Sequence, residues 1–227
     1  MLFDKARGAA AGPGAAGRLG PPRPGREHLA EVSALARLLG RRRFGRAVYV
    51  GGGDDRFSQV LRGCADRVTV AAPGPLDVDD ASADLAVMVS ALHERADPAD
   101  DFAEIARVLR PGGLAVIAAA SVLHGPGRAR YRRSGAAITG SPALAGGRLR
   151  HHPETLMLQL AVSGLRVERL VPCSSLRHAV VDRMRPGPVK RAAEFAGQAG
   201  LAAGHFGPTL FFLARPCDLA ERGTALR

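Results

Sequence analysis

Short apolar segments alternate with helical segments along most of this chain, and that alternation limits the fold more than any other feature of the sequence. Apolar runs predict strands, and several are continuously apolar, as in strands buried on both faces. The predicted strands cover residues 47–50, 67–72, 84–89, 114–120, 165–171 and 209–215. Helical periodicity predicts helices at 26–39, 54–62, 98–109, 152–164, 175–185 and 188–202. Strands that alternate with helices indicate an α/β fold with a parallel, doubly wound sheet.

The length of the chain suits one domain with a single sizeable core, at 227 residues and 23.7 kDa. Residues 1–25 are rich in Gly, Pro and Ala and have no sustained apolar period, so we expect a disordered N-terminal tail. The domain is predicted to span residues 26–216, and residues 217–227 are predicted to form a C-terminal tail.

The strongly basic composition does not by itself predict a nucleic-acid-binding protein. The formal net charge is +11 and the pI is about 11.1, which would suit a polyanionic partner. However, only Lys5 and Lys190 are lysines among the 32 basic residues, and the abundance of Arg, Ala, Gly and Pro indicates a coding bias. No basic stripe is interleaved with aromatic residues, so nucleic acid is not the expected partner.

The cysteines and the apolar runs point to a cytoplasmic protein. Cys64, Cys173 and Cys217 are far apart and lack CxxC spacing, so neither a disulfide framework nor a metal site is expected. No apolar run approaches the roughly 18 residues that span a bilayer, and the N-terminus lacks a signal-peptide core. We therefore expect no membrane contact and a reducing compartment.

The stretch VYVGGGDDRF, residues 48–57, places three glycines between a predicted strand and a predicted helix. Glycines at such a turn let the backbone approach a ligand and direct amide groups at it, which suits Gly51 and Gly53. The dinucleotide fingerprint G-x-G-x-x-G does not fit, because it needs glycine where Arg56 stands. For the glycines alone, a tight turn with a purely structural role is the alternative.

A longer stretch, DASADLAVMVSALHERADPADDFAEIARVLRPGGLAVIAAAS at 80–121, resembles the middle of class I S-adenosylmethionine-dependent methyltransferases of the type 11 group. The segments HPETLMLQLAVSGLRVERL and FFLARP resemble the last helix-strand unit and the last strand of that family. The resemblance implies a Rossmann-like, mostly parallel sheet of seven strands whose last strand is antiparallel. It also implies methyl transfer from S-adenosylmethionine, for which we expect a small-molecule acceptor. The alternative is a degenerate methyltransferase fold that acts as a non-catalytic binding or scaffold protein.

The resemblance assigns most of the candidate cofactor site to the glycine turn. Gly51 and Gly53 would face the methionine part of S-adenosylmethionine. Tyr49 stands where the family usually has an acid, and Asp55 stands where it has a third glycine. Asp54, which can cap the following helix, completes this group of candidate cofactor-binding residues.

Further candidates follow the next two strands. Ser90 and Leu92 lie just past the strand that carries Asp84, and the resemblance places them beside the sulfonium and the substrate mouth. His124 follows the strand 114–120 at the same edge of the sheet, so it is the candidate catalytic base. A solvated loop histidine is the alternative.

Arginines crowd the segment in which substrate lids occur in the family, namely Arg128, Arg130, Arg132, Arg133, Arg148 and Arg150. Arginine binds carboxylates and phosphates through paired hydrogen bonds, so the acceptor is expected to carry an acidic group. A solvated loop is the alternative, because arginine is abundant throughout the chain.

The adenosine side of the family's site is shortened in this sequence. Family members place a helix, a further strand and their turns after the second strand, but here only residues 73–83 precede the next strand. Fully extended, these eleven residues reach about 36 to 40 Å, enough to cross the sheet once. We therefore expect the sheet to lack one edge strand and one helix. Asp77 is the candidate substitute for the acid that grips the ribose in the family.

The missing helix raises the question of what covers the sheet beneath it. Two covers are possible: the shortened loop itself, through Pro73, Pro75 and Leu76, or a second subunit. Large exposed apolar patches are uncommon on monomers, so we expect a homodimer or another partner on that side.

Overall fold

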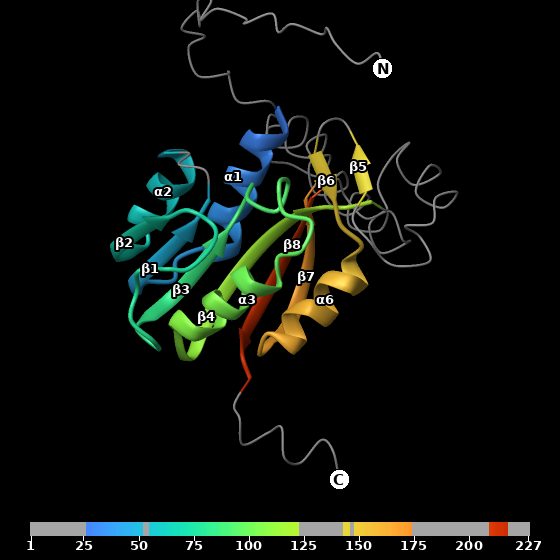
Figure 1. The fold of residues 1–227 in the computed structure, drawn as a ribbon. Coiled ribbons are helices and arrows are strands. Elements are labelled where there is room, and N and C mark those ends of the chain that lie inside the picture. Colours follow the sequence, from blue (N-terminus) through green and yellow to red (C-terminus); the bar gives the residue numbers. More distant parts are fainter. Residues whose placement is uncertain (1–25, 52–54, 123–142, 146–147, 174–208, 218–227) are drawn as a thin grey trace, which may run out of the picture.

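The computed structural model describes residues 26–51, 55–122, 143–145, 148–173 and 209–217, and in it six strands form one sheet (Figure 1). Their order is β2-β1-β3-β4-β8-β7. The strands are β1 (Phe44–Val50), β2 (Ala65–Ala71), β3 (Ala83–Met88), β4 (Leu109–Ala120), β7 (Leu165–Cys173) and β8 (Thr209–Pro216). A separate two-stranded hairpin pairs β5 (Ala143–Ala145) with β6 (Arg148–Arg150).

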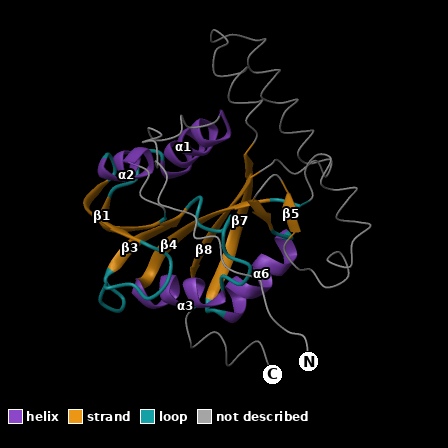
Figure 2. Ribbon diagram, turned by 45° about the horizontal axis from the view of Figure 1, so that its top comes forward, coloured by secondary structure: helices purple, strands orange, loops and turns teal. Residues whose placement is uncertain are grey.

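Helices cover both faces of the sheet (Figure 2). One face carries α1 (Arg26–Leu39) and α2 (Asp55–Arg62), and the other carries α3 (Ala99–Val108) and α6 (Pro153–Val162). Two apolar clusters fill the spaces between these layers, because alternate side chains of the central strands point to opposite faces. In β1, for example, Tyr49 packs on the α1–α2 side and Val48 on the α3–α6 side.

The predicted fold class is confirmed. Strands β1, β2, β3 and β4 run parallel to one another, and β8 runs antiparallel to both β4 and β7. The sheet ends at β2, so the edge strand that the short 73–83 segment could not supply is absent between the described strands β2 and β3. No helix lies in that interval either.

Several boundaries differ from the predictions for local reasons. The residues RPGG end α3 as expected, but they belong to β4 as a bulge, with the register against β3 shifting between Ala83 and Leu85. The hairpin β5–β6 falls in a segment for which the sequence predicted no element. Pro98, rather than Asp97, occupies the N-cap of α3, although Asp97 Oδ1 still accepts from Ala99 N at 3.2 Å. The helices predicted at 175–185 and 188–202, and the predicted tail at 1–25, lie outside the described residues.

The RVLRPGG motif holds the amino-terminal edge of the sheet together. Arg110 pairs with the buried Asp84 of β3 at 2.5 Å, and Asp84 also accepts from Arg46 N of β1 at 2.8 Å. Gly112 has a φ of +79°, a conformation that glycine adopts without steric cost. These residues therefore contribute to architecture, at the edge opposite the ends of the parallel strands where ligands bind in such folds.

The shortened loop between β2 and β3 covers the sheet where the helix is missing. Leu76 and Val78 are buried in the α3-side core, whereas Pro75 is exposed. Two covers were considered for this face, the loop and a second subunit. The loop covers it through Leu76 and Val78. On the opposite face of the edge strand, Val70 remains 46% exposed.

Two charged residues of α3 fasten this loop. Glu104 Oε2 accepts from Leu76 N at 2.8 Å, and Arg107 donates to the carbonyls of Leu76 and Val78, each at 2.9 Å. Arg107 also pairs with Glu104 and with Asp80. The hydrogen bonds from Arg107 and from Leu76 N lower the pKa of Glu104 to about 2. We call Glu104 and Arg107 the loop clamp.

Candidate functional site

The carboxyl ends of β1, β3 and β4 meet at one edge of the sheet, beside the β5–β6 hairpin (Figure 1). Three segments follow these strand ends: the glycine turn after Val50, residues 89–93 after β3, and residues 121–122 after β4. In open α/β sheets this edge is where ligands bind. The candidate site is therefore built from these three segments and from β6, which joins two of them.

Gly51 begins the glycine turn, and its position tolerates no side chain. Its N–H donates to Ala71 O of β2 at 3.0 Å. A Cβ atom at Gly51 would lie 2.7 Å from Tyr49 Oη and 3.0 Å from Val89 O, closer than real side chains allow. The close packing accounts for this glycine whether or not a ligand is bound.

Tyr49 lies beneath the turn. Its side chain is fully buried, with its ring centroid 5.9 Å from that of Phe57 in α2. The phenol therefore supports the turn from within the core. It does not point out of the edge of the sheet. A direct contact between Tyr49 and a cofactor stays a prediction. Asp55 opens α2, while Gly53 and Asp54 lie outside the described residues.

Ser90 occupies an unusual backbone conformation at the end of β3. Its φ is +64°, in the left-handed region that non-glycine residues rarely adopt. Such strain often marks functional sites. Leu92, two residues on, has its side chain fully buried in the core, so only its backbone is available to border a ligand.

His151, directly after β6, connects two of the three segments. Its N–H donates to Ala120 O at 2.8 Å, and Val122 N donates to its carbonyl at 3.1 Å. Its ring Nε2 lies 2.9 Å from Leu92 O. Because a carbonyl only accepts, Nε2 carries the proton. The side chain is buried, and desolvation lowers its pKa, so the ring is neutral at neutral pH.

Asp77 lies in the shortened loop. It is exposed, and its neighbours Leu76 and Val78 are held by the loop clamp of α3. A contact between Asp77 and the ribose stays a prediction. The candidate base His124 lies outside the described residues.

A buried carboxylate that the sequence reasoning missed also reaches this edge. Glu31 of α1 is 5% exposed, and its Oε1 accepts from Thr209 Oγ1 at 2.7 Å. Thr209 pairs with Ala120, the last residue of β4. The available signal was the position of an acid on the apolar face of α1, between Ala30 and Ala34.

No metal site or membrane segment accompanies this edge within the described ranges. Those residues contain no group of three or more His, Cys, Asp or Glu side chains that could hold a metal ion. None of the helices in the same ranges is both long enough and apolar enough to cross a membrane.

A family model described as a methyltransferase domain matches residues 42–117. This stretch runs from the residues before β1 to Ile117 of β4 and so contains the glycine turn, the shortened loop and α3. No curated protein sequence matches the chain.

Solved structures share the fold at low sequence identity. A chain from the complex of the Haloferax volcanii Trm112 methyltransferase activator matches with a TM-score of 0.55 at 17% identity, covering 84% of this chain and 91% of its own. An S-adenosylmethionine-dependent methyltransferase from Thermotoga maritima matches with 0.53 at 19% identity, covering 83% and 88%. The 1,6-didemethyltoxoflavin-N1-methyltransferase of Burkholderia thailandensis, solved with its substrate and S-adenosylhomocysteine, matches with 0.53 at 15% identity, covering 85% and 79%.

Proposed function

We propose that this protein, which carries a class I methyltransferase domain, transfers the methyl group of S-adenosylmethionine to a small-molecule acceptor. The observation that carries the proposal is the match to the methyltransferase domain over the segment that forms the glycine turn and the end of β3. The methionine half of the site fits: Gly51 and Ser90 bring two turns to the same edge of the sheet.

The adenosine half departs from the expected arrangement. At the end of β2 stand Ala71 and Ala72, where a ribose-binding acid is expected, and the shortened loop is fastened to α3. One charge-assisted hydrogen bond is worth about 1.5 to 3 kcal/mol, so its loss weakens cofactor binding roughly tenfold to a hundredfold. We therefore expect S-adenosylmethionine to bind, with reduced affinity.

Bound S-adenosylmethionine supplies an electrophilic methyl group, which an acceptor lone pair attacks in line with the breaking carbon–sulfur bond. The chain's own residues would then position the reactants. The strained backbone at Ser90 and the carbonyl of Leu92, held by His151, border the place where the acceptor would approach. The Nε2–H of His151 donates a hydrogen bond to that carbonyl, which makes His151 a positioning residue. His124 stays the proposed base for the proton that the acceptor releases.

Calorimetry with S-adenosylmethionine and S-adenosylhomocysteine tests this function. Binding of both ligands with a one-to-one stoichiometry is the expected result. The departure on the adenosine side favours a second candidate, a degenerate fold that acts as a binding or scaffold protein. That candidate predicts no binding of either ligand at millimolar concentration.

We further propose a cytoplasmic location and a homodimer. The location rests on the sequence, in which Cys64, Cys173 and Cys217 are far apart and lack CxxC spacing. The loop covers the face on which a second subunit was expected, so the dimer is supported instead by the edge position of β2 and by Val70, which is 46% exposed on the opposite face. Sedimentation at micromolar concentration should give a mass near twice 23.7 kDa; a monomer would contradict the dimer.

A further inference from the structure

The short strand β6 is held at the carboxyl edge from two sides. Leu149 N donates to His93 O, in the segment after β3, at 2.9 Å. His151, immediately after β6, binds the end of β4 through its backbone and Leu92 through its ring. Arg150 stands between these two anchored residues. Its backbone position at the edge is therefore determined by the same contacts that arrange the candidate site.

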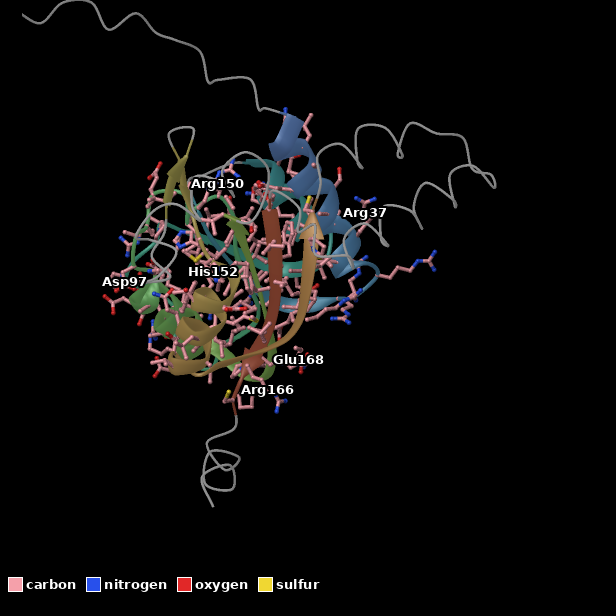
Figure 3. All side chains as sticks on the ribbon, turned by 90° about the vertical axis from the view of Figure 1, so that its right-hand side faces the viewer. Arg37, Asp97, Arg150, His152, Arg166 and Glu168 are labelled. Carbon is pink, nitrogen blue, oxygen red and sulfur yellow. The ribbon has the colours of Figure 1, made fainter. Side chains whose placement is uncertain are left out.

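The Arg150 side chain is half-buried and uses little of its hydrogen-bonding capacity. One donor, Nη1, reaches Ser121 O at a long 3.4 Å. Its Nε is shielded from solvent and has no hydrogen-bond partner among the described residues. Figure 3 shows Arg150 at the upper edge of the sheet, on the strand that leads to His152 and α6. Of the five N–H groups of a guanidinium, then, one makes a weak bond within the described part of the chain.

Several other arginines of the described part, unlike Arg150, meet carboxylates. Arg95 forms two hydrogen bonds with Asp101, at 2.8 and 3.0 Å. Similar pairs join Arg107 to Glu104 and Arg215 to Glu168. Arg150 has no such acidic partner among the described residues.

We propose that Arg150 binds an oxyanion, a carboxylate or a phosphate group, carried by the acceptor. The planar fork of the guanidinium matches both groups, because its two Nη atoms present paired donors to them. The inference rests on the proposed methyl transfer and adds the chemical class of the acceptor. The sequence predicted an acidic acceptor from the arginine-rich segment as a whole, and the proposal assigns the contact with the acidic group to Arg150.

Titration of inorganic phosphate by calorimetry tests the site without an identified acceptor. Wild-type protein is compared with Arg150→Gln, Arg150→Lys and the control Arg169→Gln, which removes the same charge from an exposed position on β7. Arg150→Gln should raise the Kd for phosphate at least about tenfold. Arg150→Lys should have an intermediate effect, because lysine keeps the charge but lacks the fork. Arg169→Gln should match wild type.

The outcomes separate this inference from the proposed function. S-adenosylhomocysteine binding is measured on the same four proteins and should be unchanged by all three substitutions. No phosphate binding by wild type, or equal binding by wild type and both Arg150 variants, would overturn the oxyanion site. A protein that shows Arg150-dependent phosphate binding but no S-adenosylhomocysteine binding would retain the site and lose the proposed function. Unfolding midpoints show whether each variant folds. If Arg150→Gln does not fold, the comparison of phosphate binding between wild type and Arg150→Lys tests the site.

Discussion

The β2 side and the β6 side of this domain depart from the expected fold in opposite ways. On the β2 side a strand and a helix are missing, and the loop that replaces them is fastened by the charged, partly exposed pair Glu104 and Arg107. On the β6 side an extra hairpin is present, and its contacts with the core pass through backbone groups and the buried neutral His151. The comparison teaches that lost secondary structure is replaced here by side-chain hydrogen bonds to backbone. The added segment, in contrast, is joined mainly by backbone pairing.

The two sides should also respond to different pH ranges. The pKa of Glu104 is lowered to about 2, so the loop clamp weakens only in acid. Burial lowers the pKa of His151 from 6.5, so the β6 side is affected as the pH falls below that value. The stability of variants on each side can be compared with that of variants elsewhere in the molecule.

The largest effect is expected from removing the apolar cover on the β2 side. Leu76→Ala should lower the free energy of unfolding by about 2 to 5 kcal/mol, because Leu76 is 6% exposed within the core. Leu158→Ala deletes the same atoms at a position that is 66% exposed and should change stability by no more than about 0.5 kcal/mol. Urea denaturation measures both. Equal effects would mean that the loop does not cover the sheet in solution.

A somewhat smaller effect is expected at the glycine turn between the two sides. Gly51→Ala should cost about 1 to 3 kcal/mol, because its Cβ would be 2.7 Å from Tyr49 Oη and 2.8 Å from Tyr49 Cζ. In a Tyr49→Phe background the penalty should shrink, since the nearest atom is gone, but not vanish. A double-mutant cycle by denaturant unfolding gives the coupling. Strict additivity would show that the two residues do not touch.

The loop clamp should contribute about 1 kcal/mol at neutral pH, as partly exposed ion pairs do. Glu104 has a folded-state pKa of about 2, below its ordinary 4.5, so its contribution is present above pH 4.5 and is lost as the pH falls toward 2. Glu104→Gln should reduce the loss of stability across that range. Glu94→Gln, at an exposed position, should leave the profile unchanged. Unfolding midpoints between pH 7 and pH 2 provide the comparison, and parallel profiles for wild type and Glu104→Gln would argue against the clamp.

The smallest effect is expected on the β6 side, where one proton is involved and the bond to Leu92 opposes the shift. Burial lowers the folded-state pKa of His151, so its contribution is present above pH 6.5 and is lost as the pH falls through the lowered value. His151→Gln retains an N–H donor but does not titrate, so stability should depend less on pH below 6.5. If His151→Gln leaves the slope unchanged, the effect does not belong to His151.

The sequence by itself determined the order of the described elements and the class of fold. Alternating apolar runs and helical periods are local signals, so they placed β1, β3, α3 and β8 within a few residues of their observed bounds. The eleven-residue interval after β2 ruled out a further strand and helix by length alone. The sequence also placed Gly51 at the turn that follows a strand.

Only the tertiary structure decided which polar groups meet. Glu31 and Thr209 are 178 residues apart, and His151 and Leu92 are 59 apart, so no local period relates them. The burial of Tyr49 beneath the turn follows from the position of Phe57 on α2. The physical reason is that periodicity reports only which face of an element is buried. The partner of a polar group depends on which distant segment the fold brings to that face.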